Sequence, residues 1–113
     1  MTGTDMALAA VGVPCALPAG WSELFSRGAA VNPDPSAFPT MGEIRGRLRE
    51  DHERLQKAIR SASPDDLERG NEIRPGWKQN ATDAVHFFAA HEFYHAGQIA
   101  LIRRTLGRTG AFG

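Results

Sequence analysis

Apolar positions repeat with helical spacing in two long segments of the chain. In the first, from Met41 to Ser61, they recur every three or four residues and fall within a sector about 60° wide on a helical wheel. This stripe consists of Met41, Ile44, Leu48, Leu55 and Ile59. Thr40 and Glu43 have the spacing of a capping box, in which each side chain satisfies a free backbone donor. The pattern predicts an amphipathic helix over 41–61.

The second helical segment covers residues 81–106. Asn80 and Thr82 are both suited to cap its start, and Gly107 is suited to end it. Asp83 in the first turn and Arg103 and Arg104 in the last also match the helix dipole. We therefore expect a second main helix over 81–106.

The remaining segments are shorter or irregular. Met6–Val11 is apolar and long enough for about two helical turns. Residues 12–40 form an irregular, proline-rich segment, with a helical turn or two around Trp21–Phe25. A capped turn is expected at 63–67 and a connecting loop at 70–79, where no strand pattern is visible. The fold class predicted is all-α.

The composition indicates one globular domain over 1–113, with 42% hydrophobic and 23% charged residues. Thirteen basic and thirteen acidic residues cancel, which leaves no electrostatic footprint for nucleic-acid binding. No apolar run approaches the length of a membrane span. The single cysteine, Cys15, excludes an internal disulfide and fits a reducing compartment. We expect a cytoplasmic protein with no nucleic-acid or membrane partner.

The second predicted helix carries the candidate metal ligands, His91 and His95, which are four residues apart. Such a pair shares one helical face and can chelate one metal ion. On the wheel both lie at the centre of the apolar face, with Gln98 and Tyr94 beside them. Burying two imidazoles and an amide costs several kcal/mol unless something satisfies them. A bound metal would do so, and so would a water cluster or a network through the Tyr94 hydroxyl.

Residues 91–95 also spell H-E-x-x-H, the motif of many zinc proteases. Those enzymes take a third ligand downstream, usually Glu or His. No residue after His95 is His, Asp, Glu or Cys. Glu92 lies about 100° from His91 on the wheel, which suits a solvated or flanking carboxylate as much as a general base. The sequence therefore argues against proteolysis.

The run from His91 through Gly97-Gln98-Ile99 to Gly107 resembles the last helix of the DinB/YfiT-like family. Its members are metal-binding four-helix bundles with a His-x3-His pair on the final helix and a third His on an earlier one. The resemblance covers roughly 19–107. It implies that His91 and His95 are two ligands of a divalent metal such as zinc or nickel, with Gln98 and Tyr94 near them. Some members resemble S-transferases or isomerases that use low-molecular-weight thiols, with the metal activating a thiolate.

The chain departs from that family in its N-terminal part. The first helix and most of the second, which carries the remaining ligand, have no counterpart, and Met6–Val11 corresponds to a stub of the second. A mis-assigned start or truncated gene and a genuine short variant both stay open. His52 lies at the edge of the 41–61 stripe and is the upstream candidate for a third ligand, or else a boundary residue facing solvent.

The missing helices also bear on assembly, because the remaining amphipathic helices keep uncovered apolar faces. We expect a homodimer whose chains together complete a partial four-helix bundle. Two functions remain open. One is a metal-dependent, S-transferase-type enzyme acting on a small thiol or another small molecule. The other is a degenerate, non-catalytic bundle that serves as a dimerisation or interaction module, its histidines being remnants.

Overall fold

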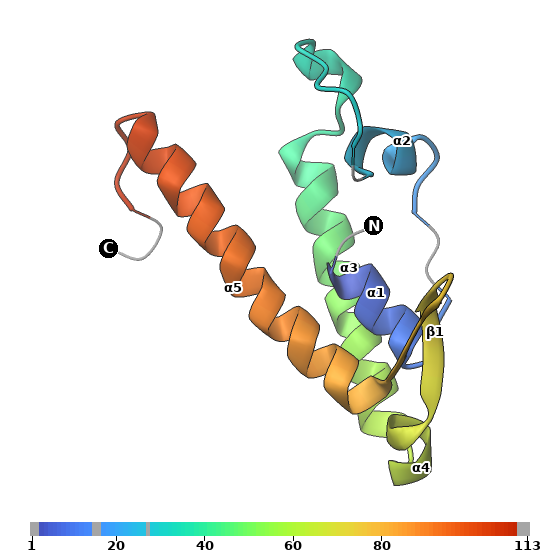
Figure 1. The fold of residues 1–113 in the computed structure, drawn as a ribbon. Helices are drawn as coiled ribbons and strands as arrows, with labels where there is room; N and C mark the ends of the chain where they lie inside the picture. Colours follow the sequence, from blue (N-terminus) through green and yellow to red (C-terminus); the bar gives the residue numbers. More distant parts are fainter. Residues whose placement is uncertain (1–2, 15–16, 27, 111–113) are drawn as a thin grey trace.

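The computed structural model describes residues 3–14, 17–26 and 28–110, and this part of the chain is mainly helical. The elements in chain order are α1 (Gly3–Ala10), α2 (Trp21–Phe25), the 3-10 turn η1 (Pro35–Ala37), α3 (Met41–Ser61), α4 (Pro64–Glu68), β1 (Gly70–Arg74), β2 (Trp77–Asn80) and α5 (Ala81–Thr105). The long helices α3 and α5 diverge from a common base, and α1 packs in the angle between them (Figure 1). No helix in the described ranges is both long and apolar enough to cross a membrane.

The start of α3 is fixed by the capping box anticipated from the sequence. The Thr40 hydroxyl accepts a hydrogen bond from the Glu43 amide at 3.2 Å, and the Glu43 carboxylate accepts one from the Thr40 amide at 2.7 Å. Ser63 and Asp66 form a second box that starts α4. Because each box satisfies backbone donors at a helix end, both helices begin at defined residues. The observed α3 coincides with the range expected for it.

Helix α5 is capped by Asn80, whose side-chain oxygen accepts a hydrogen bond from the Asp83 amide at 2.7 Å. The helix ends at Thr105, one residue before the end expected from the sequence, and Gly107 follows with φ +69°. A glycine in this left-handed conformation is a common helix stop. The 25 residues of α5 make it the longest element that the structure describes.

Residues 70–80 form a β-hairpin, so the expectation of a loop at 70–79 was wrong. The predicted all-α class holds only in part, as a mainly helical fold with one small sheet. Strands β1 and β2 pair antiparallel, from Gly70 opposite Asn80 to Arg74 opposite Trp77. Pro75 and Gly76 make the turn, where Gly76 takes φ +78°. Proline and glycine are favoured in tight turns because one presets φ and the other tolerates positive φ.

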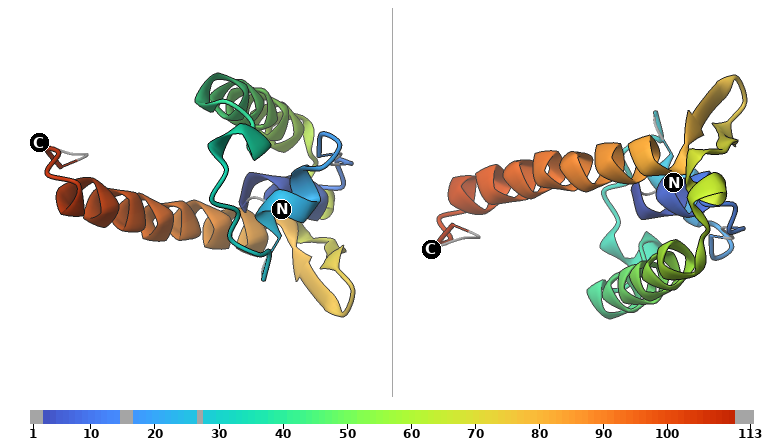
Figure 2. Two further views of the ribbon diagram at one scale, coloured as in Figure 1. Left: turned by 90° about the horizontal axis from the view of Figure 1, so that it is seen from above. Right: turned by 90° about the horizontal axis from the view of Figure 1, so that it is seen from below.

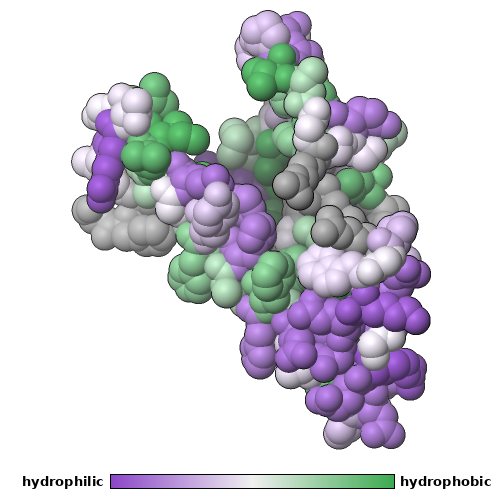
Figure 3. Space-filling view, viewed as in Figure 1, coloured by the Kyte–Doolittle hydropathy of each residue, from purple (hydrophilic) through white to green (hydrophobic). Residues whose placement is uncertain are grey.

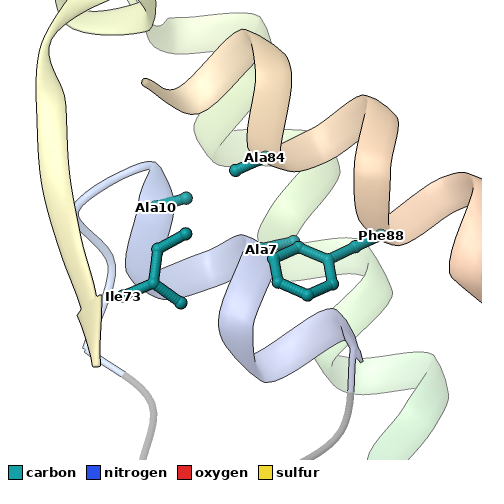
Figure 4. Packing of buried hydrophobic residues seen from close by; sticks show 5 residues of the cluster. All are labelled: Ala7, Ala10, Ile73, Ala84 and Phe88. Atoms are coloured by element: carbon teal, nitrogen blue, oxygen red, sulfur yellow. The ribbon is translucent and has the colours of Figure 1, made fainter. Parts of the chain in front are cut away.

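The hairpin is held in place because it contributes Ile73 to the core. This side chain is only 4% exposed and packs with alanines of α1 and with Phe88 of α5 (Figure 4). The buried cluster consists of Ala7, Ala10, Ile73, Ala84 and Phe88. The Trp77 ring adds an edge contact to Phe88, with centroids 6.0 Å apart. The core is therefore small and sits at the base of the two long helices.

Beyond this core, α5 leaves the rest of the molecule. Its buried residues are Ala81, Ala84 and Phe88, all within the first eight positions of the helix. Figure 2 shows the remainder projecting sideways, away from α1 and α3. The histidine pair lies where the packed part of the helix gives way to the projecting part.

Candidate metal site

His91 and His95 are brought together on one face of α5. Their Nε2 atoms lie 3.0 Å apart, and their rings are nearly perpendicular, with centroids separated by 4.5 Å. His91 is half-buried and His95 is exposed. Two imidazole nitrogens therefore converge on one point at the edge of the core.

Neighbouring side chains hold both rings. His91 stacks on Phe87 one turn before it and on Tyr94 one turn after it, with centroids 5.9 and 5.8 Å away. His95 Nδ1 lies 2.9 Å from Gln98 Oε1. A carbonyl oxygen only accepts, so in this contact His95 donates from Nδ1, and its Nε2 is the acceptor of the hydrogen bond with His91 Nε2. A hydrogen bond of this kind commonly orients a metal-ligating histidine.

The spacing of the two nitrogens fits coordination of one metal ion. Two nitrogens bound to a tetrahedral zinc, each about 2.0–2.1 Å from it, lie about 3.3 Å apart, close to the separation seen here. In the part of the chain that the structure describes, no three or more His, Cys, Asp or Glu side chains gather closely enough to hold a metal. The pair therefore fits two coordination positions, and the others are open.

Both histidines line a partly open pocket of about 300 Å³ between α1, α2, α3 and α5, here called the histidine pocket. Most of its wall is apolar and comes from Met6, Leu17, Trp21, Ile44 and Leu48. Gly3 also lines it, and a Cβ there would come within 2.7 Å of Glu92 Oε1. A side chain at Gly3 would displace only the flexible Glu92 carboxylate, because the Phe88 ring would remain at an ordinary contact distance of 3.7 Å.

Two buried carboxylates are among the polar groups that line this pocket. Asp5 is fully buried and Asp51 is 2% exposed. Asp51 Oδ2 accepts from Arg47 Nε, and Asp51 Oδ1 lies 3.0 Å from Arg54 Nη1. Arg54 Nη2 also donates to the Pro14 carbonyl at 2.7 Å. Two arginines thus compensate the charge of the buried Asp51 carboxylate.

Sequence reasoning missed these two carboxylates. For Asp51 a signal existed, because arginines four positions before and three after it are within ion-pairing reach on a helix. Nothing in the pattern marked Asp5 as buried. The inward position on α3 that the apolar stripe suggested for His52 is taken by Asp51, one residue earlier.

His52 itself is not brought to the histidine pair. It is exposed, and its Nε2 lies 2.9 Å from Gln56 Nε2. It lines two other hollows, one shared with Arg45 and Arg49 and one shared with Leu55 and Phe88. As described, the structure places His52 apart from His91 and His95.

The expectation that the pair sits at the centre of a buried face was also wrong. His95 and Gln98 are exposed, and Tyr94 is 61% exposed. The helical wheel identified residues that share a face, but no described element covers this face beyond His91. Cys15 lies outside the described residues.

Comparison with known proteins gave a match to a family model. No curated protein and no solved structure shows significant similarity to the chain. The family model of the DinB superfamily matches residues 5–99, a stretch that runs from α1 through the histidine pair. The chain belongs to the DinB superfamily.

Proposed function

We propose that this protein binds one divalent metal ion, zinc or nickel, through Nε2 of His91 and of His95. The observation that carries the proposal is the 3.0 Å convergence of the two nitrogens, with Gln98 holding His95 in the tautomer that a ligand needs. Imidazole nitrogens are preferred ligands of both metals.

We further propose that the site serves S-transferase-type chemistry on a low-molecular-weight thiol. A bound divalent ion lowers the pKa of a coordinated thiol, and the thiolate is the nucleophilic form. Phe87 and Tyr94 hold the His91 ring by stacking, and Gln98 holds the His95 proton at Nδ1. The apolar wall of the histidine pocket excludes water and accommodates the carbon skeleton of a small substrate.

Metal content and affinity of single variants test the first proposal. Protein purified without an affinity tag or chelator is expected to carry zinc or nickel by elemental analysis. The variants His91→Ala and His95→Ala should each lose it, because one imidazole alone binds weakly. His52→Ala and His86→Ala are matched controls that should retain it. Full metal retention in His91→Ala, with helicity unchanged by circular dichroism, would refute the assignment.

Two observations favour a second function. The described residues supply no third ligand, and α5 presents an apolar face beyond His91. Both suit a non-catalytic module that dimerises or binds a partner. In that case His95→Ala leaves assembly intact and no thiol transfer depends on metal. Loss of assembly in His95→Ala would instead make the histidines part of the interface.

A further inference from the structure

Six large apolar side chains on the projecting half of α5 are more than half exposed. Phe93 lies on the side opposite His91, and the other five lie on the His91 side. They are Tyr94 (61%), Ile99 (56%), Leu101 (66%), Ile102 (58%) and Leu106 (68%). At 100° per residue all five lie within about 80° of His91, so they form one continuous stripe. We call these five residues the distal face of α5.

An exposed apolar stripe of this length indicates that another surface binds over it. Its twelve-residue rise corresponds to about 18 Å of helix. Single-chain proteins rarely expose contiguous apolar patches of such size, and those that do usually bind another surface there. In Figure 3 hydrophobic residues gather at the far end of α5, on the side turned toward α3. The distal face therefore continues the wall of the angle between the two long helices.

The charges beside the distal face indicate what covers it. Glu92 and Arg103 lie on the same flank of α5, at about 100° and 120° from His91. Within the described chain neither side chain forms an ion pair, although Arg103 Nε donates to the Thr109 carbonyl at 3.2 Å. An acidic and a basic residue thus stand eleven positions apart beside the same apolar stripe.

A two-fold antiparallel pair of α5 helices would satisfy both charges. Such an axis, perpendicular to the helices, sets each flank against the same flank of the other copy. With the axis between Gly97 and Gln98, Glu92 faces the partner's Arg103, and the same contact occurs twice. No other acidic residue is available on this half of the helix, so the charges select one register.

The same register also matches the apolar residues. Tyr94 comes opposite the partner's Leu101, and both lie on the other flank of the stripe, at about −60° and −80° from His91. Gln98 lies beside its own copy at the axis. Charge pairing and apolar pairing therefore agree, as is typical of antiparallel helix pairs with apolar seams and charged flanks.

We propose that a second copy of this chain covers the distal face of α5, in an antiparallel α5–α5 pair centred between Gly97 and Gln98. The inference does not depend on metal binding. It also places His95 within the interface, so that the open side of the histidine pair faces the partner helix.

Charge reversal tests the pairing, with chelator present throughout so that metal-bridged association is excluded. Light scattering on the 113-residue chain at tens of micromolar should give twice the 12.3 kDa chain mass. Glu92→Arg and Arg103→Glu should each weaken the dimer at least about tenfold, because each creates two like-charge contacts. The double variant should restore it. The control Glu50→Arg, on the exposed side of α3, should have no effect.

Cross-linking tests the position of the axis. In a Cys15→Ser background, Gln98→Cys should form a disulfide-linked dimer under mild oxidation, whereas Ala100→Cys, on the opposite side of α5, should not. A monomeric chain overturns the proposal and leaves the distal face to a different partner. The register is overturned if neither charge reversal weakens the dimer, or if the double variant does not restore it. None of these results depends on whether His91 and His95 bind metal.

Discussion

Gln98 Oε1 lies 2.9 Å from Nδ1 of His95, one helical turn away on the same face of α5. Because this contact engages Nδ1, it orients the ring so that Nε2 lies 3.0 Å from Nε2 of His91. A parallel contact on α3 joins His52 Nε2 to Gln56 Nε2 at 2.9 Å. There the glutamine engages the ring through Nε2, the same atom that an Nε2 ligand would need.

Replacing Gln98 should therefore weaken metal binding without unfolding the chain. We expect Gln98→Leu to lower zinc or nickel affinity about 10–100-fold, the usual effect of losing the residue that orients a histidine ligand. Gln98→Glu, which keeps an acceptor, should retain affinity. Competition titration against a chromophoric chelator measures both. Gln56→Leu is the matched control, and an equal loss there would show that the effect is not specific to the pair.

Asp51 is expected to matter for stability. Asp51→Asn removes the buried carboxylate that accepts hydrogen bonds from Arg47 and Arg54. Removing one partner of a buried ion pair typically costs 3–5 kcal/mol, and we expect about 2 kcal/mol because Arg54 is partly exposed. Urea unfolding followed by circular dichroism measures the loss. Glu53→Gln, an exposed change on the same helix, should leave the midpoint nearly unchanged; equal midpoints for the two variants would contradict the prediction.

The hairpin should contribute to the core through Ile73. Truncating this 4% exposed side chain to alanine should destabilise the protein by about 2–4 kcal/mol, since no neighbour can fill the space left. Val31, which is 95% exposed, provides the control, and Val31→Ala should have almost no effect. Thermal unfolding of both variants checks the contrast. A similar small shift for both would mean that β1 packs more loosely than described.

Acid should weaken the start of α3. The Thr40 side chain, and then the Thr40 amide, hold the pKa of Glu43 below its ordinary value of 4.5 by hydrogen bonding to the carboxylate. A carboxyl whose pKa is lower in the folded state stabilises that state above its unfolded pKa and loses this effect as pH falls through the folded pKa. The stability advantage of the native chain over Glu43→Gln should therefore be full above about pH 4.5 and shrink in more acidic buffer.

Urea titrations of Glu43→Gln from pH 7 to pH 3 check this dependence. Glu50→Gln is the control, because no hydrogen bond holds its side chain in the part of the chain described. A difference between native chain and Glu43→Gln that stays constant with pH would show that the carboxylate charge does not support the cap.

Local signals in the sequence predicted the main helices well. Thr40 with Glu43, and Asn80 before Ala81, mark helix starts that the structure places at the same residues. These signals succeed because a cap is a contact between near neighbours in the chain. The strands were not predicted, because what holds them lies far away in the chain. Asn71-Glu72 and Lys78-Gln79 carry no alternating apolar pattern, and Ile73 holds the hairpin by packing into the distant core.

Helical periodicity predicted which residues of the site share a face, but not how that face packs. That His91, His95 and Gln98 share one face follows from their spacing, and the structure brings the three together. Whether another element covers that face depends on contacts between distant segments, which periodicity does not encode. The inward turn of Asp51 in place of His52 is of the same kind, because a small rotation of α3 exchanges adjacent residues.

Helix α5 packs against the rest of the described chain only near its N-terminal end, so any tilt of the helix would turn it as a rigid rod about a point near Ala84. The histidines stand about 10–16 Å from that point and Leu106 about 33 Å from it, at 1.5 Å per residue. A tilt of about ten degrees would move the helix tip by about 6 Å but His91 by only about 2 Å. Both nitrogens belong to the same rigid rod, so their separation would not change. Large excursions of the helix end are thus compatible with an unaltered pair of ligands.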